Sequence, residues 1–167
     1  MKGIVPIIIV VILIALIATM FFSMGEVQDM TVVKKGTAAG KPVEMVEGHF
    51  QCSECGMIIN NLQFAAQVTS TAGKTWFFDD HGCMAAWISR GEFQEEPALW
   101  VPDLVTGEWI DGRAAWYSRT DSTPMSYGFG AYSTPSDQYI DFATMQMLML
   151  KGETFANPSV RKELLGN

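Results

Sequence analysis

The chain has 167 residues, with 18 acidic residues against 11 Lys and Arg, and a formal net charge of −7. This acidic balance argues against a nucleic-acid partner, because such binding depends on Lys and Arg that neutralise phosphates. It also disfavours adhesion to anionic lipid head groups.

The N-terminal segment is apolar from Ile4 to Phe22 and contains no charge, Asn or Gln. A helix that spans a bilayer needs about 20 such residues, and no small-residue cleavage site of a signal peptide follows this segment. Lys2 before the segment and Glu26 after it favour a cytoplasmic N-terminus. The sequence therefore predicts a single-pass transmembrane anchor over residues 1–25, with the rest of the chain outside the cytoplasm, on the periplasmic side.

The remainder divides into a linker and two parts of similar pattern. Residues 26–46 are polar and rich in small residues, which is typical of a flexible spacer. Residues 47–95 and 96–167 each combine short strands, an aromatic strand, a polar capping residue and one helix. The predicted fold class is α+β: an N-terminal transmembrane helix followed by two similar small ββαβ-type lobes.

The predicted elements alternate in both lobes. In the first lobe, we expect strands near residues 64–69 and 75–78 and a helix over residues 82–90, which Gly91 ends. In the second lobe, we expect strands near residues 109–110 and 115–118 and a helix over residues 135–150.

The most specific motif is Cys52-x-x-Cys55-Gly56-Met57. A zinc ribbon needs a second ligand pair, a c-type haem needs His after the second Cys, and a thioredoxin-like pair begins a helix; none of these fits. A disulfide between Cys52 and Cys55 stays open for an oxidising compartment. Cu(I) is the other interpretation, because this soft ion prefers thiolate and thioether ligands, and Met57 adds a thioether.

A second motif gathers polar and sulfur side chains where the first helix is expected to begin. His81 and Cys83 follow Asp79 and Asp80, and the N-terminus of a helix favours a thiolate. Both residues are therefore candidate ligands. Alternatively, Cys83 is a small buried core residue and His81 only forms a hydrogen bond at the helix cap.

The third motif is Pro124-Met125, in a loop rich in Gly and aromatic residues. A Met in such a loop is a candidate thioether ligand for the same soft ion. The chain contains no Gly-x-Ser-x-Gly, phosphate-binding loop or His-Glu-x-x-His motif. We therefore expect a binding protein and not an enzyme.

Together these motifs resemble the NosL family, the accessory proteins of nitrous-oxide reductase, over about residues 47–150. The resemblance rests on Cys52-x-x-Cys55-Gly56-Met57, Phe77-Phe78-Asp79-Asp80-x-Gly82-Cys83-Met84 and Pro124-Met125 with Gly128-Phe129. It implies a copper chaperone that binds one Cu(I), with two ββαβ lobes similar to part of the organomercurial lyase. The family's Cys and Met ligands are best matched by Cys55 and Met125, and Met57 is the next candidate.

The expected function is that of an extracytoplasmic, membrane-anchored Cu(I) metallochaperone that delivers copper for the maturation of nitrous-oxide reductase or a related copper enzyme. The candidate metal ligands are Cys55, Met125, Met57, Cys52, His81 and Cys83. Two other classes stay open. One is an enzyme, either a thiol-disulfide oxidoreductase that uses Cys52 and Cys55, or an organomercurial-lyase-like enzyme that uses Cys55, Cys83 and Asp80. The other is a structural module with a Cys52–Cys55 disulfide.

Overall fold

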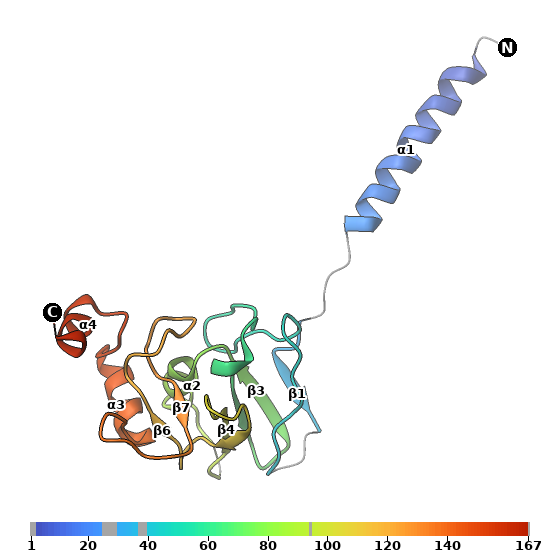
Figure 1. Ribbon diagram of the computed structural model, residues 1–167. Coiled ribbons are helices and arrows are strands. Elements are labelled where there is room, and N and C mark those ends of the chain that lie inside the picture. The colour runs from blue at the N-terminus through green and yellow to red at the C-terminus, as the bar shows by residue number, and fades with distance from the viewer. Residues whose placement is uncertain (1–2, 25–29, 37–39, 94, 167) are drawn as a thin grey trace.

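The computed structural model describes residues 3–24, 30–36, 40–93 and 95–166. Helix α1 (Ile4–Met24) lies apart from an α+β region that holds the other helices and all the strands (Figure 1). The α+β class predicted from the sequence is therefore confirmed for this region.

Within the described residues, no helix is both long and apolar enough to cross a membrane. This finding contradicts the transmembrane anchor expected over residues 1–25, together with the single-pass, periplasmic-side placement that depended on it.

The main sheet has five strands in the order β1-β3-β2-β4-β5, and all neighbouring strands are antiparallel. The strands are β1 (Val33–Lys35), β2 (Ala66–Thr69), β3 (Lys74–Phe78), β4 (Ala98–Pro102) and β5 (Trp109–Asp111). Strand β4, from the second predicted lobe, pairs with β2 of the first. The sheet therefore crosses the expected division at residue 95, and the fold differs from two separate ββαβ lobes.

The second half adds a small ribbon and two helices to this sheet. The elements are β6 (Trp116–Tyr117) paired with β7 (Ala131–Tyr132), α3 (Phe142–Lys151) and α4 (Pro158–Leu165), while the first half supplies α2 (His81–Ile88) and the short 3₁₀ helix η1 (Leu62–Phe64). Helix α2 packs against α3 of the second half and against β2 and β3 of the first. Because of this packing, the start of α2 lies between the two halves of the chain.

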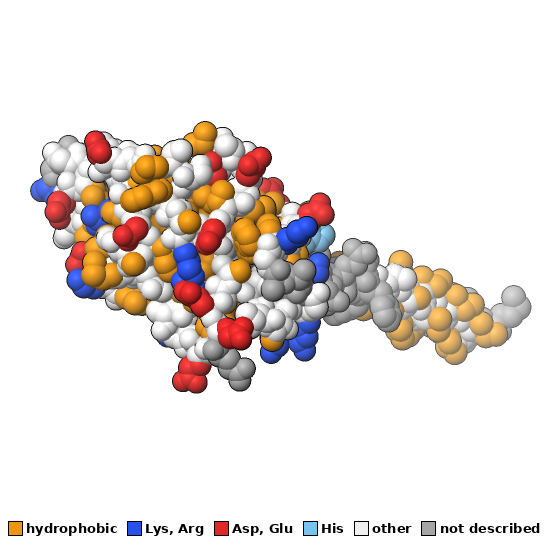
Figure 2. Space-filling model, turned by 90° about the horizontal axis from the view of Figure 1, so that it is seen from below, with side chains coloured by type: hydrophobic (Ala, Val, Ile, Leu, Met, Phe, Trp, Pro, Cys, Tyr) orange, Lys and Arg blue, Asp and Glu red, His pale blue; other side chains and the backbone are white. Residues whose placement is uncertain are grey.

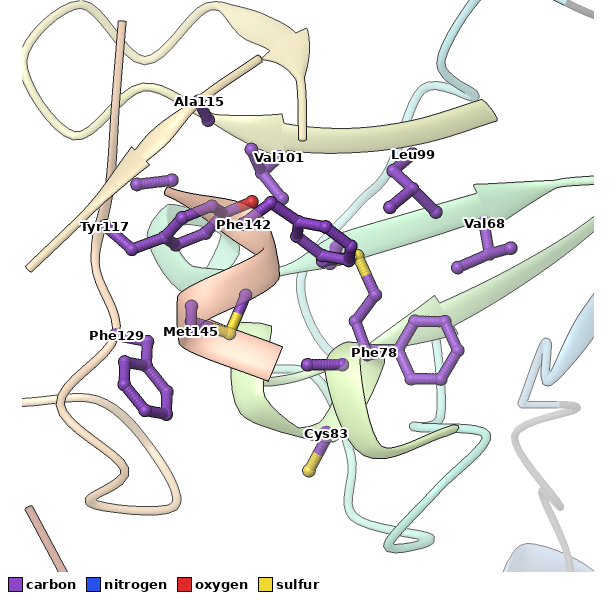
Figure 3. Packing of buried hydrophobic residues seen from close by; sticks show 14 of the residues in the cluster. Val68, Phe78, Cys83, Leu99, Val101, Ala115, Tyr117, Phe129, Phe142 and Met145 are labelled. Carbon is purple, nitrogen blue, oxygen red and sulfur yellow. The ribbon is translucent and has the colours of Figure 1, made fainter. Parts of the chain in front are cut away.

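One hydrophobic core joins both halves. Phe78 of β3, Val101 of β4, and Phe142 and Met145 of α3 belong to the same buried cluster, and Cys83 of α2 lies at its edge (Figure 3). The position of Cys83 is therefore determined by the packing of α2 into the core.

On the face seen in Figure 2, acidic and basic side chains are interspersed among apolar ones.

Asp103 stabilises the connection between β4 and the segment after β7. Its carboxylate accepts hydrogen bonds from the Thr106 hydroxyl at 3.0 Å, the Val105 amide at 3.3 Å and the Ser133 hydroxyl at 3.1 Å. Burial alone would raise the pKa of Asp103, but these hydrogen bonds together hold it below its ordinary value. The ionised carboxylate is therefore the form that stabilises the fold.

We expect Asp103→Asn to lower the free energy of unfolding by about 2 kcal/mol at pH 7, because an amide group would face hydrogen-bond donors that now meet a charged acceptor. A depressed pKa contributes stability that is present above the unfolded-state pKa of about 3.9 and is lost as the pH falls through the folded-state pKa. Urea denaturation at pH 7 and at pH 3 should show this loss shrinking at the lower pH. The exposed Asp137→Asn is the control, and an equal loss at both pH values would contradict the role of the charge.

Candidate metal centre

The Cys-x-x-Cys segment forms a tight turn that is held on both sides. The Cys52 amide donates to the Met57 carbonyl at 2.8 Å, and the Gly56 amide donates to the Cys52 carbonyl at 3.0 Å. Gly56 adopts φ +75°, a left-handed conformation that favours glycine. The Ser53 amide donates to the Phe77 carbonyl of β3 at 2.8 Å, so the turn is docked on the sheet and does not begin a helix.

Backbone and ion-pair contacts orient the two cysteines of the turn. The Cys55 amide donates a 3.5 Å hydrogen bond to the Cys52 sulfur, and a donor of this kind favours the thiolate. Between them, Glu54 forms an ion pair with Arg90, just beyond the end of α2. This ion pair thus connects the turn of Cys52 and Cys55 to the residues that directly follow α2.

Asp80 fixes the start of α2 and links it to the second half of the chain. It is the N-cap, and its carboxylate accepts from the Gly82 amide at 2.8 Å and from the Met125 amide at 3.0 Å. Burial raises the pKa of Asp80 to about 6, despite the hydrogen bonds to Thr123, Gly82 and Met125. This cap sets the first turn of α2, where Cys83 is buried.

Three sulfurs and one carboxylate meet at this place. Ligand atoms of Cys52, Cys55, Asp79 and Cys83 all lie within 4.8 Å of one another. Cys52, Asp79 and Cys83 are buried, whereas Cys55 is exposed, and all three cysteines are free thiols. The Cys55 thiol donates to Asp79 Oδ1 at 3.4 Å. The chemistry and spacing of these four groups fit a metal ion, since thiolates and carboxylates are metal ligands.

The thiols differ in their acidity. A hydrogen bond with the Cys83 thiol lowers the pKa of Cys52 to about 7, against the opposing effect of burial. Partial burial of its sulfur raises the pKa of Cys55 to about 12, although the residue as a whole is exposed. The hydrogen bond to Cys52, together with burial, raises the pKa of Cys83. Cys52 is therefore the most acidic of the three thiols in the metal-free protein.

The six ligand candidates from the sequence do not all meet at this cluster. Cys52, Cys55 and Cys83 do, whereas the buried His81 ring forms a 2.8 Å hydrogen bond between Nδ1 and the Phe129 carbonyl and is not among the four clustered groups. The two methionines adjoin the site through their backbones. The Met57 carbonyl accepts from Cys52, and the Met125 amide donates to Asp80.

Asp79 is the member of the cluster that the sequence did not identify. The organomercurial-lyase-like alternative used Asp80, yet the carboxylate of Asp80 is occupied by the helix cap and it is Asp79 that joins the cysteines. A signal was available in the sequence: two adjacent aspartates precede α2, and an N-cap needs only one side chain. The other carboxylate was therefore free for a different role.

Comparisons of the chain with protein families, with curated proteins and with solved structures give no match. The resemblance to the NosL family accordingly stays a prediction that rests on the motifs, and the four-residue cluster stands on its own geometry.

Proposed function

We propose that the protein is a Cu(I)-binding metallochaperone whose principal ligands are the thiolates of Cys52, Cys55 and Cys83. The observation that carries this proposal is the meeting of three free thiols from two separate segments of the chain. Cu(I) is a soft ion that prefers sulfur ligands. Met57 and Met125 stay predicted thioether donors, supported by the backbone contacts that hold each of them beside the site.

The unequal burial of the thiols supports a role in transfer. Cys52 and Cys83 are 2% and 1% exposed, whereas Cys55 is exposed. A sulfur ligand of a partner protein can approach a metal ion from the side of Cys55 while the two buried thiols still hold it. Stepwise exchange of this kind moves a soft ion without releasing it into water.

The client follows from the resemblance to the NosL family. We propose a copper enzyme under assembly, with nitrous-oxide reductase as the first candidate. Copurification of the copper-loaded chain with metal-free nitrous-oxide reductase, followed by the copper content of each protein, tests this proposal. Copper that stays on the chain during incubation with the client would contradict it.

A thiol-based enzyme is the second candidate function, because the Cys55 thiol donates to a carboxylate and so has a proton acceptor beside it. We propose binding and transfer in preference to catalysis, since the turn of Cys52 and Cys55 does not begin a helix as redox-active pairs do. Reduction of insulin and cleavage of a carbon–mercury bond are the assays, and turnover in either would establish the enzyme instead.

Anaerobic Cu(I) titration of the reduced full chain against a competing chelator tests the proposed function. We expect one tightly bound equivalent, and a loss of affinity on the order of 100-fold, or about 2.7 kcal/mol, in Cys55→Ser. Ser53→Ala changes the same turn without removing a sulfur and is the matched control. Equal copper affinity in Cys55→Ser and in the unsubstituted protein would contradict the proposal.

A further inference from the structure

Asp79 is unusual within the cluster because it brings a hard oxygen ligand to three soft sulfurs. The residue is only 3% exposed. Its Oδ1 accepts a hydrogen bond from the Cys55 thiol, its carboxylate also interacts with the Cys52 thiol, and its Oδ2 is buried without a hydrogen-bond partner among the described residues. Burying a carboxylate oxygen without a donor costs free energy. Cu(I) does not account for this cost, since it prefers sulfur.

The four groups have the number and spacing of a tetrahedral site. With metal–sulfur bonds of about 2.3 Å, tetrahedral geometry places neighbouring sulfurs about 3.8 Å apart. The ligand atoms already lie within 4.8 Å of one another, so small side-chain movements close the distance. The chain approaches the ion from two segments, the turn at Cys52 and Cys55 and the β3–α2 connection with Asp79 and Cys83.

The charge of the ligands also favours a divalent ion. Three thiolates and one carboxylate carry four negative charges, of which a divalent ion compensates two and Cu(I) only one. In the part of the chain that the structure describes, the ion pairs join Arg90 to Glu54 and Arg113 to Glu96, and neither includes a member of the cluster. Uncompensated charge is costly at a buried site.

We propose that Cys52, Cys55, Cys83 and Asp79 also bind a divalent, sulfur-preferring cation of the Zn²⁺ class in a tetrahedral site with three sulfurs and one oxygen. Asp79 is the ligand that distinguishes this cation from Cu(I), which uses the sulfurs alone. The inference rests on the proposed function only in that both use the same three thiols. A Zn²⁺ ion held in this way would keep the thiols from oxidation until Cu(I) replaces it.

Co²⁺ titration of the reduced full chain, followed by displacement with Zn²⁺, tests the inference. Tetrahedral Co²⁺ has intense visible bands, and each thiolate adds ultraviolet charge-transfer absorption. We expect both signals at one equivalent in the unsubstituted protein. Asp79→Asn, which keeps the size of the side chain, should lower the Co²⁺ and Zn²⁺ affinities by at least about 10-fold and change the Cu(I) affinity by less than about 3-fold. Asp137→Asn, at an exposed position, is the control.

Asp79→Cys tests whether residue 79 binds the ion directly or only stabilises the surrounding structure. A fourth thiolate should retain the tetrahedral bands and raise the charge-transfer absorption in the ratio of four sulfurs to three. Unchanged Co²⁺ binding in Asp79→Asn would overturn the inference, as would an equal loss of Co²⁺ and Cu(I). Cu(I) binding by a protein that binds neither Co²⁺ nor Zn²⁺ overturns the inference alone, whereas failure to bind Cu(I) overturns the proposed function.

Discussion

Replacement of Cys83 by Ala is expected to weaken Cu(I) binding on the order of 100-fold, or about 2.7 kcal/mol. Cys83 comes from α2 and is the one thiol that is distant in the chain from the turn of Cys52 and Cys55. Without it, the ion keeps only the two thiols of one turn, and the connection between the two segments is lost. The small Ala side chain fits the buried position, so the fold should tolerate the change.

The matched control for Cys83→Ala is Met125→Leu, which removes a thioether at nearly constant volume. We expect this variant to lower the Cu(I) affinity by less than about 10-fold, because a neutral thioether gains less from a cation than a thiolate does. Competition titrations on both variants, with near-ultraviolet circular dichroism to verify the fold, make the comparison. A larger loss in Met125→Leu than in Cys83→Ala would replace the three-thiol site with the Cys55 and Met125 pair that the family resemblance implies.

The three thiols of the cluster were predictable from the sequence because sulfur is rare and its chemistry is specific. Spacing alone identified Cys52 and Cys55, and the expected helix start identified Cys83. Asp79 was not predicted because aspartates are common and, from the sequence, either Asp79 or Asp80 could cap the helix. Only the packing of the turn on β3, through the bond from Ser53 to Phe77, brings that carboxylate to the sulfurs.

The fold was also predicted in part, and the prediction failed where strands that are distant in the sequence pair with each other. The strands β2 and β3 and the helix α2 lie close to the expected ranges, since each has strong local signals. Helix α3 ends near the expected residue 150 but begins at Phe142, with Asp141 as its N-cap, seven residues after the expected start at residue 135. The pairing of β4 with β2 has no such local signal, and it merges the two expected lobes into one sheet. The expected membrane anchor is also contradicted, since no helix among the described residues is long and apolar enough to cross a membrane.

The loop between β6 and β7 is where the second half of the chain supports the site. Its Met125 amide binds Asp80, and its Phe129 carbonyl binds His81. Gly128, between these residues, has φ +91°. A Cβ atom there would lie 2.8 Å from the carbonyl carbon of Arg119 and 2.7 Å from the Phe155 side chain. Backbone atoms cannot move away as the end of a flexible side chain can, so glycine is required.

Gly128→Ala is therefore expected to lower the free energy of unfolding by about 3 kcal/mol or more, from the strained φ and the forced contacts together. At this chain length, such a loss lowers the melting temperature by about 10 °C. Gly107→Ala is the matched control, because Gly107 also has positive φ, +74°, but its Cβ would meet nothing within 4 Å. Urea denaturation of both variants separates the contribution of the contacts from that of φ. Equal losses would show that the contacts with Arg119 and Phe155 contribute nothing, and that the loop can shift without disturbing its hydrogen bonds to Asp80 and His81.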